Sequence, residues 1–322
     1  MTPVTVSSSA AMSGLRGRDF LDVTDLVPAE LHGLLDLADE LRDALRGGRP
    51  HPLCAGRTLG MIFQKQSTRT RVSFEVGMVQ LGGYALHLSA TNELQLGRGE
   101  TIADTAMVLS RYLDALMIRT HAQADVEELA IHASVPVING LTEQAHPCQA
   151  LADHLTMRDH LGALSGKTVA YLGDPNNVCC SLVEAATMAG MHVIVASPVG
   201  YDLPEATARI ALEHAEQYGG SLHLTRDPDA AASRADALYT DVFVSMGQES
   251  ERDARMQALQ GYAVNEDRAA LLGEDGIVMH CLPARYGEEI DESVLYGPRS
   301  AVWDQAENRL HAQKALLAAL LA

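Results

Sequence analysis

Residues 67–71, Ser-Thr-Arg-Thr-Arg, place three hydroxyls and two guanidinium groups in five consecutive positions. They follow an apolar run, and the next segment carries Val72, Val76 and Val79 at a spacing that predicts a helix. The start of a helix offers free backbone N–H groups and the positive end of the helix dipole. Arginines add charge-assisted hydrogen bonds. We therefore predict a phosphate-like anion at residues 67–71, whereas the alternative is an N-cap followed by solvated arginines.

His146 precedes Pro147, and proline favours the first turn of a helix. The dipole at a helix start disfavours a protonated imidazole, so we expect a neutral ring that still donates one hydrogen bond. A histidine that only caps the helix is the alternative. The sequence around His146 does not decide between the two.

Asp241 and Cys281 each close an apolar run that predicts a strand. A carboxylate at Asp241 suits a cationic ligand, although a structural residue there would cap the following turn. Cys281 is a candidate reactive thiol, and inert packing at the end of a buried strand is its alternative.

Composition narrows the function classes. A net charge of −18 opposes nucleic-acid binding, and no apolar run reaches the roughly 20 residues of a membrane-spanning helix. The first 18 residues lack the apolar core of a secretory signal. Five cysteines without a Cys-x-x-Cys pair predict neither disulfides nor a zinc site, so we expect a cytoplasmic protein. The loop at residues 173–177 lacks the glycines of a dinucleotide site, which argues against an oxidoreductase.

Apolar or β-branched runs alternate with helical patterns along the chain. The runs are residues 58–63, 115–118, 135–138, 168–172, 192–196, 237–244 and 276–279, and the clearest helical patterns are residues 29–46, 147–161 and 308–321. This alternation predicts an α/β protein with two doubly wound domains of mostly parallel strands. We place a first domain at residues 1–154, to which a C-terminal helix at residues 306–322 returns, and a second at residues 155–305. Each polar cluster follows a strand, where open α/β sheets bind ligands.

Taken together, these motifs resemble the aspartate/ornithine carbamoyltransferase family, from about residue 18 to the C-terminus. The run at residues 67–71 resembles its phosphate loop, and residues 146–149 match its His-Pro-x-Gln. The segments at residues 241–249 and 280–283 resemble the ornithine branch, and residues 306–309 complete the pattern. The family usually carries Gly where Pro175 stands.

The resemblance implies a role for each matching residue. The residues expected to bind carbamoyl phosphate are Ser67, Thr68, Arg69, Thr70, Gln95, Arg119, His146, Gln149, Cys281, Leu282 and Arg309. The residues expected to bind ornithine are Asn177, Asp241, Ser245 and Met246, and the catalytic set is Arg119, His146, Asp241 and Cys281. The family's Cys-Leu-Pro segment commonly has a cis bond, which we expect between Leu282 and Pro283.

The implied reaction moves the carbamoyl group of carbamoyl phosphate to the δ-amine of L-ornithine, in arginine biosynthesis or the arginine deiminase pathway. It implies no metal and no organic cofactor, no nucleic-acid or membrane partner, and a homotrimer or a multiple of it. The alternatives are a carbamoyltransferase for putrescine or a modified ornithine, and a catalytically silent binding protein on the same scaffold. Intact Ser67, Arg69, Arg119, His146 and Cys281 argue against the silent protein.

Overall fold

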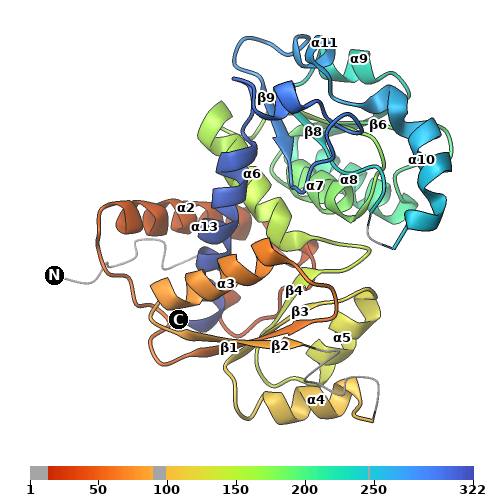
Figure 1. The fold of residues 1–322 in the computed structure, drawn as a ribbon. Helices are drawn as coiled ribbons and strands as arrows, with labels where there is room; N and C mark the ends of the chain where they lie inside the picture. Colours follow the sequence, from red (N-terminus) through yellow and green to blue (C-terminus); the bar gives the residue numbers. More distant parts are fainter. Residues whose placement is uncertain (1–13, 90–98, 246) are drawn as a thin grey trace. The chain divides into compact units, whose positions relative to one another are not determined.

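The computed structural model describes residues 14–89, 99–245 and 247–322, which fold as two compact units (Figure 1). Unit 1 contains Met1–Ala152 and Asn308–Ala322, and unit 2 contains Asp153–Glu307. The unit boundaries fall within two helices, α6 (Pro147–Leu161) and α13 (Val302–Leu321). Among the described residues, no helix combines the length and the apolar character needed to cross a membrane.

Unit 1 is built on a four-stranded parallel sheet in the order β2-β1-β3-β4. Its strands are β1 (Thr58–Phe63), β2 (Tyr84–Ser89), β3 (Ala115–Arg119) and β4 (Val137–Leu141). Helices α2 (Pro28–Arg46), α3 (Thr68–Gln80) and α13 lie on one side of the sheet, and α4 (Ile102–Leu109) and α5 (Gln123–His132) on the other (Figure 1). A short 3-10 helix, η1 (Val23–Asp25), precedes α2. The unit is therefore a doubly wound α/β sandwich.

Local sequence explains how α2 begins and which face it buries. Pro28 stands at its first position, and the Glu30 carboxylate accepts a hydrogen bond from the Val27 N–H at 3.1 Å. Leu31, Leu34 and Leu41 are buried, as the helical spacing predicts. Leu45, which continues the same helical spacing, is exposed instead.

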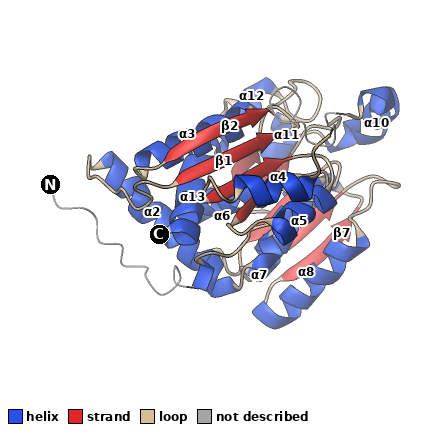
Figure 2. Ribbon diagram, turned by 90° about the horizontal axis from the view of Figure 1, so that it is seen from below, coloured by secondary structure: helices blue, strands red, loops and turns tan. Residues whose placement is uncertain are grey.

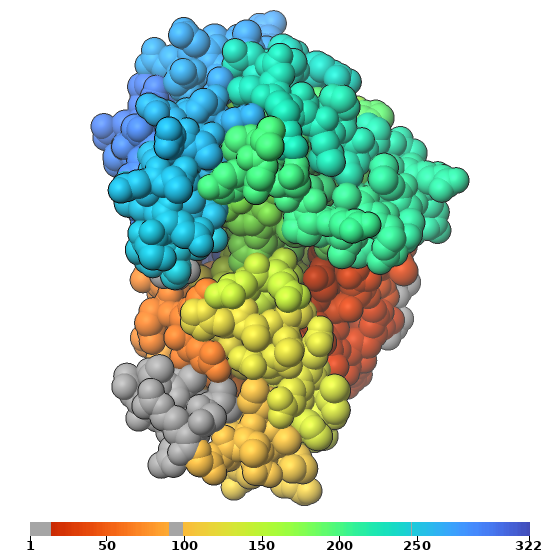
Figure 3. Space-filling model, turned by 90° about the vertical axis from the view of Figure 1, so that its right-hand side faces the viewer, coloured from red at the N-terminus to blue at the C-terminus, as the bar shows by residue number. Residues whose placement is uncertain are grey.

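The C-terminal helix α13 packs within unit 1 from Asn308 onward. The Asn308 Oδ1 accepts a hydrogen bond from Arg42 at 2.9 Å, and the Leu320 carbonyl accepts one from the Gly17 N–H at 3.0 Å. The predicted return of this helix to the first domain is confirmed. On the other side of the sheet of unit 1, α4 and α5 form part of the molecular surface; they lie in the yellow range of the colour bar in Figure 3.

Unit 2 is built on a five-stranded parallel sheet in the order β7-β6-β5-β8-β9. Its strands are β5 (Thr168–Leu172), β6 (His192–Ala196), β7 (Ser221–Thr225), β8 (Ala237–Thr240) and β9 (Ile277–His280). Its other helices are α7 (Asn177–Met188), α8 (Glu205–Tyr218), α9 (Pro228–Ala232), η2 (Glu249–Glu251), α10 (Arg252–Leu259), η3 (Gln260–Tyr262), α11 (Glu266–Ala269) and α12 (Glu292–Leu295). Helices α7 and α8 pack against each other, and α8 runs beside β7 (Figure 2).

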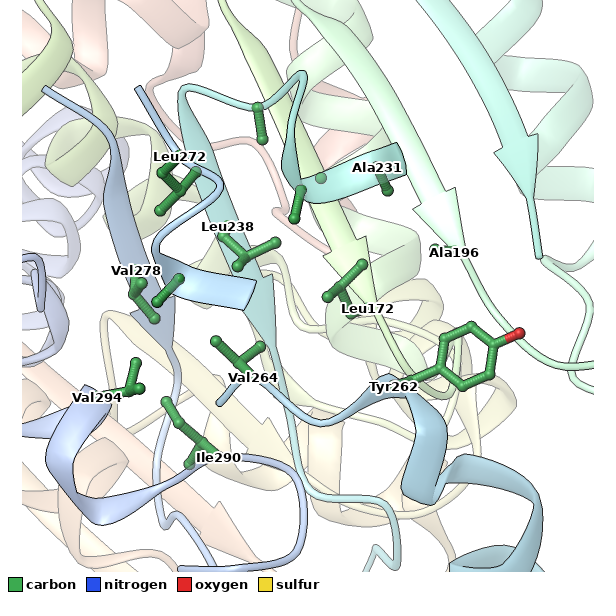
Figure 4. Packing of buried hydrophobic residues seen from close by; sticks show 14 of the residues in the cluster. Leu172, Ala196, Ala231, Leu238, Tyr262, Val264, Leu272, Val278, Ile290 and Val294 are labelled. Carbon is green, nitrogen blue, oxygen red and sulfur yellow. The ribbon is translucent and has the colours of Figure 1, made fainter. Parts of the chain in front are cut away.

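The core of unit 2 joins the sheet to the segments that pack on it. Leu172, Leu238 and Val278 from the strands meet Leu272 and Ile290, which lie outside the strands, in one apolar cluster (Figure 4). Burying such side chains contributes roughly 1.5–3 kcal/mol each. This packing fixes the loops at the carboxyl ends of β5, β8 and β9.

The predicted α/β class and parallel sheets are confirmed, and residues 58–63, 168–172 and 192–196 are strands with the predicted bounds. The predictions missed β2 and β7 because these edge strands are partly exposed and lack an unbroken apolar run. The strand predicted at residues 237–244 ends at Thr240, and the one predicted at residues 135–138 corresponds to β4, which begins two residues later, at Val137, and ends at Leu141.

Strand order identifies the ligand-binding edge of each sheet. In unit 1 the direction of winding reverses between β1 and β3, and in unit 2 between β5 and β8. Open α/β sheets bind ligands at the carboxyl ends of the strands that flank such a switch point. At these points, Ser67–Thr70 follow β1, Arg119 ends β3, Asn177 begins the helix after β5, and Asp241 follows β8. His146 and Gln149 come after the neighbouring strand β4, and Cys281 comes after the neighbouring strand β9.

Candidate active site

The predicted phosphate loop of unit 1, residues 67–71, lies at the start of α3. Ser67 is its N-cap, and its hydroxyl accepts a hydrogen bond from the Thr70 N–H at 3.3 Å. Thr70 is buried, Arg69 is half-buried, and Thr68 is exposed. Arg71 is exposed and pairs with Glu75 at 3.0 Å, so it belongs to the outer face of the helix. The predicted helix start is confirmed.

The Thr70 hydroxyl is where three elements of unit 1 meet. It lies 3.2 Å from the Ser67 Oγ and accepts hydrogen bonds from Arg119 at 3.5 Å and Arg309 at 3.4 Å. Both arginines are buried. Arg119 is the last residue of β3, and Arg309 lies in α13. Two guanidinium groups held away from solvent create a strongly positive environment at this helix start.

His146 immediately precedes α6 and is buried. Burial, and then the positive charges of Arg309, Arg119 and Arg69, hold the pKa of His146 well below its usual 6.5. The imidazole is therefore neutral at neutral pH, as the sequence predicted from the helix start. The stronger physical cause is burial beside three guanidinium groups.

Gln149, one turn into α6, is buried beside the same arginines. Its Oε1 accepts a hydrogen bond from the Arg309 Nη1 at 2.8 Å. Unit 1 thus gathers Ser67, Thr70, Arg119, Gln149 and Arg309 through direct contacts. Hydrogen-bond donors dominate the group, which suits an anion with a polarisable carbonyl.

In unit 2, Asp241 follows β8 directly and is buried. Its Oδ1 accepts a hydrogen bond from the Cys281 thiol at 3.1 Å, and its Oδ2 accepts one from the Asn176 Nδ2 at 2.7 Å. The carboxyl ends of β5, β8 and β9 therefore meet at this carboxylate. A buried carboxylate with a neighbouring thiol can accept hydrogen bonds from an ammonium group.

Asn176 and Asn177 begin α7, beyond Pro175. Asn176 is the N-cap and accepts hydrogen bonds from the N–H groups of Val178 and Cys179 at 3.0 and 3.2 Å. Asn177 is the first helical residue, at the positive end of the helix dipole. A proline where the family usually has glycine is compatible with this helix start.

The loop after β9 has a distinct backbone. Leu282 has a φ of +59°, and its bond to Pro283 is cis, which confirms the prediction. The Leu282 N–H donates to the His280 Nδ1 at 2.8 Å, and the His280 Nε2 lies 3.1 Å from the buried Glu289 carboxylate. His280 therefore uses both ring nitrogens to hold the loop that carries Cys281.

Ser245 lies in a turn beyond β8. Its N–H donates to the Gln248 Oε1 at 3.1 Å, and the Gly247 N–H donates to the Glu249 carboxylate at 3.0 Å. Hydrogen bonds from backbone N–H groups, first that of Glu249 itself and then that of Gly247, lower the pKa of the Glu249 carboxylate. Within the described part of unit 2, no hydrogen bond joins Ser245 to Asp241. Gln95 and Met246 lie outside the described residues.

Arg255 of α10 connects two of these segments, although the sequence analysis did not select it. Its Nε donates to the Phe243 carbonyl at 2.8 Å, and its Nη2 pairs with Asp174. Burial raises the pKa of Asp174 and outweighs the attraction of Arg255. Arg255 thus ties the segment after β8 to the loop after β5. Nothing in the local pattern of α10 distinguishes it from a surface arginine.

Asp241, His280 and Cys281 each offer a ligand atom, and these atoms lie within 4.8 Å of one another. Both ring nitrogens of His280 are already engaged with Leu282 and Glu289. Metal binding would break one of those contacts. The geometry favours Asp241 and Cys281 as acceptor and thiol for an organic ligand.

Comparison with known proteins agrees with this geometry. Residues 18–159 match the carbamoyl-phosphate-binding domain of the aspartate/ornithine carbamoyltransferases, and residues 165–320 match their Asp/Orn-binding domain. The chain is 53% identical over 313 residues to an ornithine carbamoyltransferase of Halalkalibacterium halodurans, covering 97% of this chain and 98% of that protein. It is 52% identical over 307 residues to the one of Pyrococcus horikoshii, covering 95% and 96%.

The fold gives the same result. The solved ornithine carbamoyltransferase of Pyrococcus furiosus superposes with a TM-score of 0.93 at 51% identity, covering 95% of this chain and 98% of that one. Two matched domain types that together span most of the chain, with relatives more than 50% identical over nearly its full length, show that the chain belongs to the aspartate/ornithine carbamoyltransferase family.

Proposed function

We propose that this protein transfers the carbamoyl group of carbamoyl phosphate to the δ-amine of L-ornithine, which gives L-citrulline and phosphate. One observation carries the proposal. Unit 1 gathers guanidinium groups at its switch point, and unit 2 holds a buried carboxylate at its own. Carbamoyl phosphate is an anion, and ornithine carries two amines, so each set of side chains complements one substrate.

Carbamoyl phosphate binds unit 1 in this proposal. The phosphate binds at the start of α3, to Ser67, Thr68, Arg69 and Thr70. There the positive end of the helix dipole and the guanidinium groups both attract an anion. Arg119, His146 and Thr70 donate to the carbonyl oxygen as negative charge develops on it. Gln149 holds the carbamoyl NH₂. Gln95 contributes from the segment outside the described residues.

Ornithine binds unit 2. Asn177 and the Met246 N–H receive the α-carboxylate, and Asp241 receives the α-ammonium. Cys281, hydrogen-bonded to Asp241, lies beside the δ-amine and with Asp241 helps it lose a proton. Leu282, in the same loop, contributes to the binding of carbamoyl phosphate. The turn that begins at Ser245 closes over the substrates and excludes water.

The chemistry follows from these positions. The neutral δ-amine attacks the carbamoyl carbon, a C–N bond forms, and the carbonyl oxygen gains negative charge. The bond from that carbon to the phosphate oxygen then breaks, phosphate leaves with the electron pair, and the attacking nitrogen loses a proton. Catalysis arises from positioning and electrostatic stabilisation. A cytoplasmic location suits five free thiols.

The test is formation of citrulline and phosphate with a panel of acceptors: ornithine, putrescine, aspartate, N-acetylornithine and N-succinylornithine. Putrescine lacks the carboxylate and leaves its donors unpaired, at roughly 1–3 kcal/mol per buried group. We expect ornithine to exceed putrescine by more than tenfold in kcat/KM. Equal turnover of the two amines would overturn the assignment of the acceptor.

We also propose that the chain assembles as a homotrimer or a multiple of it. Val72, Val76 and Val79, whose spacing predicted this helix, are 48%, 37% and 66% exposed in the structure. Three exposed valines on one helix face of unit 1 could pack against another copy of the chain, because subunit interfaces bury apolar side chains of this kind.

Light scattering should therefore give three times the 34.5 kDa of the chain, or a multiple of that mass. Val76→Asp, which places a charge on this face, should lower the mass. Val199→Asp, at an exposed valine of unit 2, is the matched control and should leave it unchanged. A monomer mass for the parent protein at micromolar concentration contradicts the assembly.

A further inference from the structure

Gln313 is a buried side chain of α13, one helical turn beyond Arg309. Its Oε1 accepts a hydrogen bond from the Arg309 Nε at 2.9 Å. Its Nε2 donates to the Ser73 Oγ of α3 at 2.9 Å, across a sequence separation of 240 residues. The Gln313 amide therefore links Arg309, near the C-terminus, to helix α3, which begins at the proposed phosphate loop.

Chemistry fixes the orientation of this amide. A guanidinium group only donates, so the oxygen of Gln313 must face Arg309. The Ser73 hydroxyl donates its single hydrogen to the Arg69 carbonyl at 2.6 Å, with the Thr70 carbonyl at 3.2 Å. Ser73 can then only accept from Gln313. The hydrogen bonds run in one direction, from the Arg309 guanidinium to the first turn of α3.

This relay of hydrogen bonds, from Arg309 through Gln313 to Ser73, determines where the rest of the Arg309 guanidinium points. With Nε held by Gln313, Nη1 reaches Gln149 at 2.8 Å and Nη2 reaches Thr70 at 3.4 Å. A planar guanidinium fixed at three nitrogens has little freedom to rotate. Hydrogen bonds in a chain within a low-dielectric interior also strengthen one another.

Packing keeps the two ends of the relay at a constant separation. At Gly77 of α3, a Cβ would lie 3.3 Å from the Lys314 Cγ of α13, so the two helices approach closely at this glycine. A close helix contact transmits small displacements rather than absorbing them. The phosphate loop and Arg309 therefore belong to one rigid frame within unit 1.

We propose that Gln313, acting through Ser73, is a positioning residue for carbamoyl phosphate: it holds the Arg309 guanidinium in register with the first turn of α3. This inference rests on the proposed function, because it assigns Arg309 and that turn to the same anionic substrate. Gln313 itself does not touch the substrate.

Gln313→Met keeps the length of the side chain and removes both hydrogen bonds. We expect the KM for carbamoyl phosphate to rise at least about tenfold while the KM for ornithine stays within twofold, because a charged donor loses its fixed acceptor. Ser73→Ala should have a smaller effect. Added to Gln313→Met, it should have almost none, since the relay is already broken.

Lys314→Met is the matched control. Lys314 is the next residue of α13 and is also buried, but its Nζ contacts the Leu41 carbonyl and His51 rather than the arginines. It should change the unfolding temperature and leave both KM values at the parent level. A merely structural role for Gln313 would make the two variants alike.

Calorimetric titration with inorganic phosphate separates this inference from the proposed function. Gln313→Met should weaken phosphate binding about tenfold even if the parent makes no citrulline, in which case the function fails and the relay stands. An unchanged phosphate affinity and an unchanged KM for carbamoyl phosphate in Gln313→Met would overturn the relay, whatever the acceptor proves to be.

Discussion

Asp241→Asn is expected to lower kcat/KM for ornithine by about 10²–10³-fold, and the Kd of carbamoyl phosphate should stay at the parent value. The Asp241 carboxylate accepts hydrogen bonds from Cys281 and Asn176, and in the proposed complex from the α-ammonium. An amide removes the negative charge and turns an NH₂ group toward one of these donors. Lost charged hydrogen bonds and unpaired donors together account for an effect of roughly 3–4 kcal/mol.

Asp236→Asn is the matched control for this experiment. Asp236 stands just before the amino end of β8, where it accepts a hydrogen bond from the Thr168 N–H at 2.8 Å. The same chemical change at the opposite end of the same strand should leave the ornithine KM unchanged. Full ornithine turnover by Asp241→Asn would require another carboxylate as the ammonium partner.

His146→Ala is expected to lower kcat by about 10²–10³-fold, the usual effect of removing one donor to a developing oxyanion. The KM for carbamoyl phosphate should change far less, because in the proposed complex the phosphate is bound by the start of α3 and its arginines. His160→Ala removes an exposed histidine from the far end of α6, where it lies 2.9 Å from Asp304, and serves as the control. Parent-like kcat in His146→Ala would remove the imidazole from the mechanism.

The depressed pKa of His146 adds a pH dependence with a defined sign. Burial, aided by Arg309, Arg119 and Arg69, holds the folded-state pKa well below 6.5. Between that value and 6.5, the unfolded chain binds a proton that the folded protein does not. Folding stability is therefore lost as the pH falls below 6.5. The unfolding temperature of the parent should drop more between pH 7 and pH 5 than that of His146→Ala.

Periodicity and turn chemistry predicted the central strands and the long helices well. Their side chains are buried on both faces of a sheet or on one helix stripe, which leaves a pattern in the sequence. Edge strands β2 and β7 leave a weaker pattern because water covers part of them. Val72, Val76 and Val79 show what periodicity cannot predict. An apolar helix face has the same sequence pattern whether the chain's own core or another molecule covers it.

Amino-acid types and their order alone identified the family resemblance and predicted the parallel α/β class, the helix start at residues 67–71 and the neutral state of His146. The resemblance rests on short motifs in a fixed order, and the other predictions rest on alternating apolar runs, a helix start and a run of donors within a few residues. Tertiary structure alone decided which distant groups share a hydrogen bond. Gln313 meets Ser73 because α13 packs on α3, and Arg255 meets Asp174 because α10 lies beside the loop after β5; no local pattern encodes either contact.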